Sequence, residues 1–165
     1  MVIGSLVDGA GMSHTMNEYT PQVPRHPSNI LGDFWPIAEK FLTRLHVLIV
    51  DGEPLIRWSI AETLADAGCD VAEAGDAREA LERIAAAPAP DVILLDFRSP
   101  DSSDLRLLEA IRRVAPQSSV IVMTAYGTSD IWADAIALGA YRVVNKPIEM
   151  SDIVLLVQEA HAAAR

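Results

Sequence analysis

Cysteine and long apolar runs are scarce in this chain, and each scarcity excludes a class of protein. Cys69 is the only cysteine among 165 residues, which excludes an internal disulfide and a cysteine metal cluster and agrees with a reducing compartment. Charged residues interrupt every apolar stretch before it reaches the roughly 18 residues that a membrane span requires. The first residues lack a basic start followed by a long apolar region, so they make a poor signal peptide. The sequence predicts a soluble, cytoplasmic protein with no membrane partner.

Basic charge is also in short supply. The chain has 13 Lys and Arg against 23 Asp and Glu, for a formal net charge of −10. Most of the acidic excess lies after residue 45, so no basic face is available for a phosphate backbone, and we expect no direct nucleic-acid binding. Only two of the basic residues are lysines, Lys40 and Lys146. Because Lys146 stands alone and directly before Pro147, its position suggests a specific role.

The N-terminal part differs from the rest of the chain. Residues 1–32 are rich in Gly, Ser, Thr, Asn and Pro without a sustained period, which predicts a flexible tail. Residues 33–45 begin with Asp33 as a cap and place apolar residues at helical spacing, which predicts a short amphipathic helix. Its apolar stripe either packs onto the following domain or forms a homodimer contact.

From His46 onward, apolar strand patterns alternate with helical patterns. The expected strands are 46–51, 70–75, 92–96, 119–125 and 141–145, and the expected helices are 54–68, 76–87, 103–116, 129–140 and 150–164, the last capped by Ser151. Five such units in about 120 residues are typical of a doubly wound α/β fold. We therefore predict one domain over 46–165 with a five-stranded parallel sheet in the flavodoxin-like order 2-1-3-4-5.

Acidic residues follow two strands that this order makes neighbours. Asp51 and Glu53 follow the first strand, and Asp96 lies at the end of the apolar run VILLD. The carboxyl ends of these strands flank the crevice where α/β sheets place their chemistry. Clustered carboxylates repel unless a cation lies among them, and oxygen ligands suit Mg²⁺. The alternative is that Asp51 only caps the next helix.

Two further polar residues end the remaining strands. Thr124 ends the fourth strand, and the fifth strand runs into Lys146 and Pro147. A hydroxyl and an ammonium beside Asp96 complete a site in which a carboxylate could receive a phosphoryl group. Lys146 would balance the charge of that group, and Thr124 would donate a hydrogen bond to it.

Four segments in this order and spacing carry a family resemblance: IVDGEPLIRWSI, VILLDFRSPDSSDL, VIVMTAYGT and GAYRVVNKP. Together they resemble the receiver domain of bacterial two-component response regulators, especially receivers of nitrogen-regulation-type activators, over residues 46–163. The resemblance implies that Asp96 is phosphorylated by a sensor histidine kinase or phosphotransfer protein with Mg²⁺ bound. It also implies that the backbone carbonyl of Arg98 is a metal ligand and that residues 128–163 contact a downstream protein. Such a domain is a signalling phosphoprotein and not an enzyme.

The sequence departs from the family pattern at two functional positions. Receivers usually carry two adjacent acids after the first strand, but here Asp51 is followed by Gly52, and Glu53 stands one position too late. This change predicts weakened magnesium binding unless water or Glu53 fills the gap. Val143 replaces the usual Tyr or Phe before Lys146. We expect Trp132 to fill the volume beside Val143, the alternative being an exposed aromatic at a partner surface.

Three other functions compete with a phosphorylated receiver. Gly52 and Val143 leave open a pseudo-receiver, an interaction module that signals without phosphorylation. A hydrolase with an aspartyl nucleophile is disfavoured because Arg98 stands where its second acid belongs. A dinucleotide-binding enzyme is disfavoured because the first strand is followed by DGEP and not by a glycine-rich turn. With no DNA-binding or nucleotide-binding motif in the chain, we expect a stand-alone or excised receiver.

Overall fold

Strands and helices alternate along the chain in the computed structural model, which describes residues 44–86, 88–97, 102–125 and 127–164. The elements are β1 (His46–Val50), α2 (Pro54–Asp66), β2 (Asp70–Ala74), α3 (Ala77–Ala85), β3 (Val92–Phe97), α4 (Ser102–Val114), β4 (Ser119–Thr124), α5 (Ser129–Ala137), β5 (Arg142–Asn145) and α6 (Met150–Ala163). The strands form one parallel sheet in the order β2-β1-β3-β4-β5. This topology confirms the predicted fold class.

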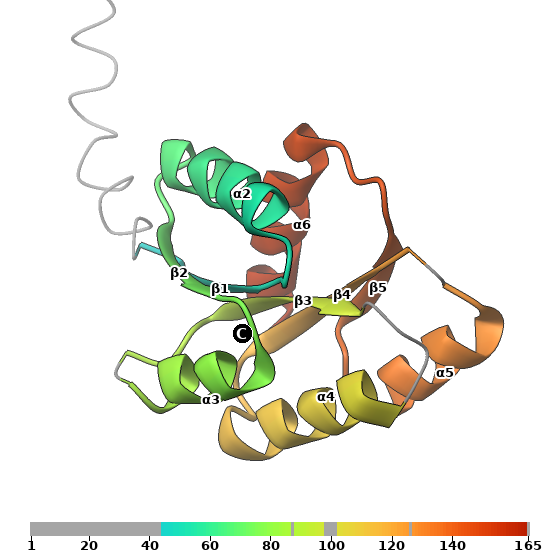
Figure 1. Cartoon of the computed structure of the whole chain (residues 1–165). Coiled ribbons are helices and arrows are strands. Elements are labelled where there is room, and N and C mark those ends of the chain that lie inside the picture. The colour runs from blue at the N-terminus through green and yellow to red at the C-terminus, as the bar shows by residue number, and fades with distance from the viewer. Residues whose placement is uncertain (1–43, 87, 98–101, 126, 165) are drawn as a thin grey trace, which may run out of the picture. The chain divides into compact units, whose positions relative to one another are not determined.

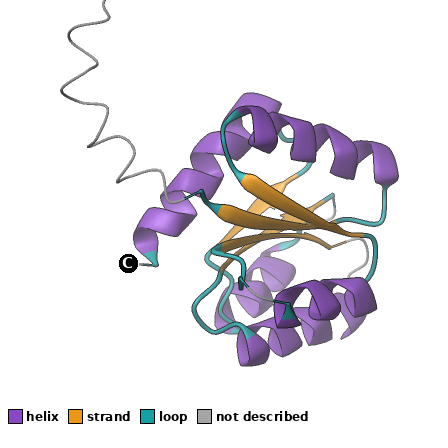
Figure 2. Ribbon diagram, turned by 90° about the vertical axis from the view of Figure 1, so that its left-hand side faces the viewer, coloured by secondary structure: helices purple, strands orange, loops and turns teal. Residues whose placement is uncertain are grey.

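The sheet lies between two layers of helices (Figures 1 and 2). Helices α2 and α6 cover one face, and α3, α4 and α5 cover the other. Every residue of β3 and β4 is buried, as expected for continuous apolar strands that are covered on both faces. Side chains alternate between the two faces, so Ile93 and Leu95 join the core under α3 and α4, whereas Val92 and Leu94 join the core under α2 and α6.

Local sequence accounts for several helix boundaries. Pro54 is the first residue of α2, where its missing amide hydrogen is not needed. The Asp76 side chain accepts a hydrogen bond from the backbone amide of Glu79 and caps α3, as predicted. Gly68 follows α2 with a φ of 88°, a left-handed conformation that glycine adopts without strain. The predicted cap of the last helix was wrong, because Ser151 lies inside α6, which begins at Met150.

Several expectations fall on residues outside the described part of the chain. These are the tail over 1–32, all but the last two residues of the helix over 33–45, and the backbone carbonyl of Arg98. Arg44 and Leu45 are described and belong to neither a helix nor a strand. None of the helices that the structure describes is long and apolar enough to cross a membrane.

Candidate functional site

The strand register brings the two aspartates of the predicted site together. Val50 of β1 is paired with Leu95 of β3, so Asp51 and Asp96, each one residue further, lie side by side at the carboxyl ends of these strands. By the alternation of side chains both point to the face covered by α2 and α6. Both are buried, with Asp51 1% exposed and Asp96 9% exposed. Two carboxylates at one buried point require a positive partner.

Lys146 supplies that positive partner and directly follows β5, the strand at one edge of the sheet. Its Nζ lies 2.8 Å from Asp51 Oδ2 and 2.8 Å from Asp96 Oδ1, so one ammonium bridges both carboxylates. The Lys146 amide donates a 2.8 Å hydrogen bond to the backbone oxygen of Thr124. A cis peptide bond joins Lys146 to Pro147. The backbone at the end of β5 therefore anchors the lysine while its side chain crosses toward β3 and β1.

The bridge changes the charge balance of the site. Burial by itself lowers the pKa of the Lys146 ammonium, but the hydrogen bonds and charges of Asp51 and Asp96 outweigh it and raise that pKa above 10.5. Lys146 therefore stays protonated at neutral pH. Two carboxylate groups share this single ammonium, an arrangement that suits a further cation.

Thr124 lies at the same edge of the sheet. It ends β4, is 1% exposed, and is paired with Phe97 of β3 on one side and Asn145 of β5 on the other. In the strand register, Asp96 directly precedes the β3 partner of Thr124, and Lys146 directly follows its β5 partner. The predicted residues Asp51, Asp96, Thr124 and Lys146 thus gather at one end of the sheet.

The loop after Asp51 contributes its backbone and not a third acid. Glu53 is exposed at the start of α2, and its backbone amide donates a 2.8 Å hydrogen bond to Asp51 Oδ1. Asp51 does not cap α2, because the N-cap residue is Glu53 and no side-chain hydrogen bond caps the helix. Its second carboxylate oxygen accepts a hydrogen bond from Lys146. Among the described residues, no three acidic, histidine or cysteine side chains are grouped closely enough to hold a metal ion.

The donor set still fits magnesium. Mg²⁺ usually keeps several waters and is held through one or two carboxylates. Asp51 and Asp96 are two such groups, and they share one ammonium. The residues present therefore suit a hydrated ion, with fewer direct protein ligands than two adjacent acids would give.

Val143 and Trp132 differ in burial. Val143 is buried in the core under α3, α4 and α5, where Ala135 is also buried and Ile131 packs against the same cluster. Trp132 lies outside this cluster and is 39% exposed. Its Nε1 lies 2.5 Å from the place that a Cβ on Gly127 would take. The expected filling of the volume beside Val143 stays a prediction.

Arg57 belongs to the site, although the sequence did not single it out. Its Nη1 donates a 2.6 Å hydrogen bond to the backbone oxygen of Asp51, and its Nε contacts Glu73 Oε2 at 3.0 Å. The only signal in the sequence was its place in IRWSI, which was used for the family resemblance alone. An arginine on a helix gives no indication that it bonds to a backbone carbonyl six residues earlier.

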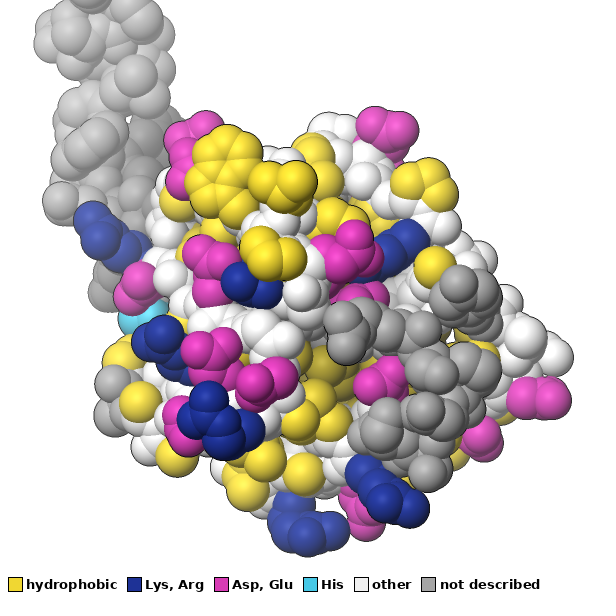
Figure 3. Space-filling model, in the orientation of Figure 1, with side chains coloured by type: hydrophobic (Ala, Val, Ile, Leu, Met, Phe, Trp, Pro, Cys, Tyr) yellow, Lys and Arg dark blue, Asp and Glu magenta, His cyan; other side chains and the backbone are white. Residues whose placement is uncertain are grey.

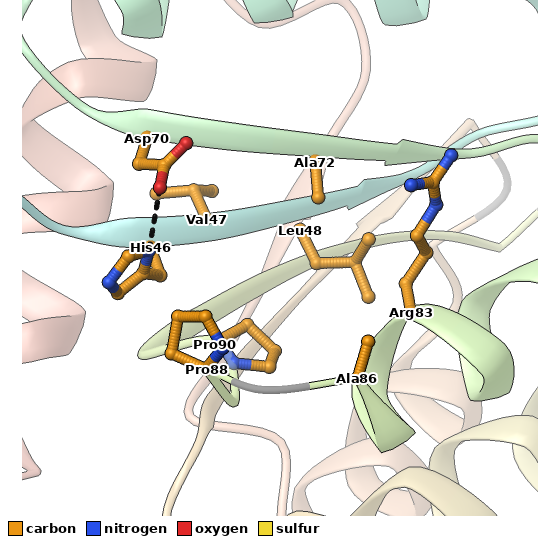
Figure 4. A pocket seen from close by; sticks show the side chains of 9 residues that line it. All are labelled: His46, Val47, Leu48, Asp70, Ala72, Arg83, Ala86, Pro88 and Pro90. Carbon is orange, nitrogen blue, oxygen red and sulfur yellow. Dashed lines mark ion pairs between the residues drawn. The ribbon is translucent and has the colours of Figure 1, made fainter.

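A hollow at the opposite end of the strands has no comparable chemistry (Figure 4). It encloses about 170 Å³ beside the starts of β1 and β2, and Pro88 and Pro90 form one wall. His46 Nδ1 lies 3.0 Å from Asp70 Oδ2 in this hollow, and both side chains are substantially exposed to water. The hollow is therefore not the better candidate for the functional site.

Apolar side chains gather on the surface of α2 (Figure 3). Leu55 is 81% exposed and Trp58 is 60% exposed. Both belong to the first turns of the helix that follows Asp51. Exposed apolar groups in such a cluster are typical of a surface that contacts another protein.

Comparison with known proteins identifies relatives over the part of the chain that carries this site. A family model described as the response regulator receiver domain matches residues 47–158. The response regulator protein PilR of Pseudomonas aeruginosa is 37% identical over 119 residues, which cover 72% of this chain and 26% of that protein. The DNA-binding transcriptional regulator NtrC of Escherichia coli is 36% identical over 114 residues, which cover 69% and 24%. The chain thus spans about a quarter of the length of these two relatives.

Solved structures agree with this assignment. The receiver domain of NtrX from Brucella abortus has a TM-score of 0.63 and 31% identity, with 70% of this chain and 98% of that chain covered. A CheY-like receiver domain protein from Methanospirillum hungatei has a TM-score of 0.68 and 25% identity, with 74% and 97% covered.

Proposed function

The chain belongs to the response regulator receiver domain family of two-component signalling, and from this premise we propose that Asp96 accepts a phosphoryl group from a phosphohistidine. The donor is a sensor histidine kinase or a phosphotransfer protein in the cytoplasm. One observation carries the proposal: the Lys146 ammonium bridges Asp51 and Asp96 at the carboxyl end of the sheet. Receiver domains are signalling modules and not enzymes in the usual sense, so the phosphorylated domain acts through protein contacts.

Asp96, Lys146 and Thr124 have different roles in the proposed phosphoryl transfer. A carboxylate oxygen of Asp96 forms the new bond to phosphorus as the bond from phosphorus to the partner's imidazole nitrogen breaks, and that nitrogen keeps the electron pair. The Lys146 ammonium pairs with the phosphoryl oxygens, which carry more negative charge than the carboxylate alone. The Thr124 hydroxyl donates a hydrogen bond to one of these oxygens. Burial strengthens both interactions, because little water competes for the donors.

Receiver domains generally bind Mg²⁺ at the phosphorylation site. When bound, the ion supplies positive charge that reduces the repulsion between the carboxylates and the incoming phosphoryl group. In this chain Asp51 and Asp96 would hold it, with Glu53 and the Arg98 carbonyl as further candidate ligands. Gly52 offers no side-chain ligand, so we propose that magnesium binds more weakly than it would to two adjacent acids.

The output of the phosphorylated domain is proposed to be a protein contact through residues 128–163. This range contains α5, β5 and α6, which follow Thr124 and flank Lys146 in the chain. A shift of Thr124 or Lys146 on phosphorylation would therefore move the backbone that leads directly into this surface.

Phosphorylation is tested by incubating the chain with acetyl phosphate and Mg²⁺ and measuring the intact mass. We expect one phosphoryl adduct on the parent and none on Asp96→Asn, which keeps the shape of the side chain and removes the nucleophile. Gly52→Asp restores a second acid, and we expect it to reach half-maximal labelling at a lower magnesium concentration than the parent. Asp91→Asn removes an acid elsewhere and is expected to label like the parent.

The outcomes separate the alternatives. An adduct on Gly52→Asp but not on the parent would describe a receiver disabled at its metal site. No adduct on either protein would contradict phosphorylation and favour the pseudo-receiver, whose support is Gly52 and Val143. An adduct that persists on Asp96→Asn would place the acceptor elsewhere.

A further inference from the structure

Arg57 connects three elements around Asp51. It lies in α2, its Nη1 donates to the backbone oxygen of Asp51 at 2.6 Å, and its Nε contacts Glu73 Oε2 of β2 at 3.0 Å. Its side chain is only 19% exposed. Nη1 also lies 3.5 Å from the place that a Cβ on Gly75 would take, so the guanidinium lies over the carboxyl ends of both β1 and β2.

Asp51 depends on such contacts because of the residue that follows it. Gly52 has more backbone freedom than any other residue type, so the turn between Asp51 and α2 is intrinsically loose. The Glu53 amide and the Lys146 ammonium hold the two carboxylate oxygens of Asp51. The Asp51 amide bonds the backbone oxygen of Ala74 at 3.1 Å, which holds the side of the residue away from Gly52. On the side of Gly52, the Asp51 carbonyl accepts the hydrogen bond from Arg57, the one side-chain donor that the structure describes for it.

Arg57 is itself held in place from the β2 side. The carboxylate of Glu73 accepts from Nε and so orients the planar guanidinium. The neighbouring end of β2 is held by Glu79, whose Oε2 accepts a 2.7 Å hydrogen bond from the Gly75 amide. The guanidinium that contacts Asp51 is therefore itself held in place by hydrogen bonds and is not a freely rotating surface group.

We propose that Arg57 is a positioning residue for phosphorylation, because it fixes the backbone of Asp51 next to the flexible Gly52 and so places the Asp51 carboxylate beside Asp96. The inference rests on the proposed function of that site. Arg57 touches neither the acceptor nor the phosphoryl group and acts through Asp51. A guanidinium can make both bonds at once because its donors form a rigid fork, whereas a lysine ammonium cannot reproduce that fork.

The test compares Arg57→Ala and Arg57→Lys with the parent and with Arg78→Ala. Arg78 is a matched control, because it is also a helical arginine paired with a glutamate, but both side chains of that pair are exposed. The first measurement is hydrogen exchange of the Glu53 backbone amide by nuclear magnetic resonance, which reports on the bond to Asp51 without any phosphorylation. The second is the rate of labelling by acetyl phosphate as a function of magnesium concentration. Urea unfolding confirms that each variant is folded.

We expect Arg57→Ala to speed exchange of the Glu53 amide and to raise the magnesium concentration for half-maximal labelling, each roughly tenfold, the size expected for one lost charge-assisted hydrogen bond. The maximal labelling rate at saturating magnesium should change less, because Asp96 and Lys146 are intact. Arg57→Lys should fall between Arg57→Ala and the parent, and Arg78→Ala should match the parent.

Parent-like amide exchange and magnesium dependence in a folded Arg57→Ala would overturn the proposal. If Arg57→Ala does not fold, the test rests on Arg57→Lys. Parent-like amide exchange and magnesium dependence in Arg57→Lys would then overturn the proposal. If the parent itself is not labelled, the proposed function fails, while the exchange of the Glu53 amide still tests whether Arg57 holds Asp51.

Discussion

Replacing Lys146 by methionine should destabilise the fold by far more than the loss of an ordinary ion pair. The lysine side chain is 16% exposed, and the side chains of its partners Asp51 and Asp96 are 0% and 4% exposed. Methionine keeps an unbranched chain of similar length but leaves two buried carboxylates facing each other. Removing one partner of a buried pair costs about 3–5 kcal/mol. We therefore expect the free energy of unfolding to fall by about that amount at pH 7.

The control is Arg142→Met, which breaks the surface pair with Glu159. That pair has a similar 2.8 Å distance, but its side chains are 44% and 55% exposed, so its loss should cost less than about 1 kcal/mol. Both variants are unfolded in urea and followed by far-ultraviolet circular dichroism. A loss in Lys146→Met that equals the loss in Arg142→Met would refute the reasoning, since burial would then make no difference.

The pH dependence gives a second check on the same variant. The pKa of Lys146 is raised in the folded protein, so its stabilising contribution is fully present below its ordinary pKa of 10.5 and is lost as the pH rises through the higher folded value. The stability difference between parent and Lys146→Met should shrink over that alkaline range. A difference that stays constant from neutral to alkaline pH would contradict the ionic bridge.

Three further predictions concern the fold and are measured by the same urea unfolding. Ile121→Ala empties a position in β4 that is 0% exposed and should cost about 2–5 kcal/mol; a loss below 1 kcal/mol would mean that the core closes over the gap. Asp76→Ala removes the cap of α3 and should cost about 1 kcal/mol, whereas Asp76→Asn should be nearly neutral because asparagine caps as well. Gly139→Ala should lower the free energy of unfolding more than Gly68→Ala. Both glycines have a positive φ, but only at Gly139 would the new Cβ lie 3.0 Å from Arg112 Nε. Equal losses of stability in the two variants would contradict a steric contribution.

The sequence was sufficient for the architecture. The runs at β3 and β4 are apolar without alternation, which requires strands covered on both faces, and short connections between alternating elements leave few topologies. The parallel order in turn placed Asp51, Asp96, Thr124 and Lys146 at one edge. The structure agrees at each of these points, because they depend on patterns that are local or on rules that hold for every such sheet.

Helix starts without a strong local signal were less predictable. Asp76 was identified as a cap because its side chain bonds an amide three residues away. Ser151 was not the cap of α6, because the chain turns into the helix at Glu149, without a side-chain hydrogen bond at that position. Where no local bond selects the first residue, packing against the sheet decides where the helix begins.

The sequence by itself determined the fold and the edge of the sheet where the polar residues lie. Only the tertiary structure decided that Lys146 binds both aspartates and that Arg57 holds the carbonyl of Asp51. Lys146 and Asp51 are 95 residues apart in the chain. No local pattern specifies such a contact, because the reach of a side chain across three strands depends on their register and twist. The physical reason is that propensity and periodicity act over a few residues, whereas the charge balance of a site depends on distances set by the packed sheet.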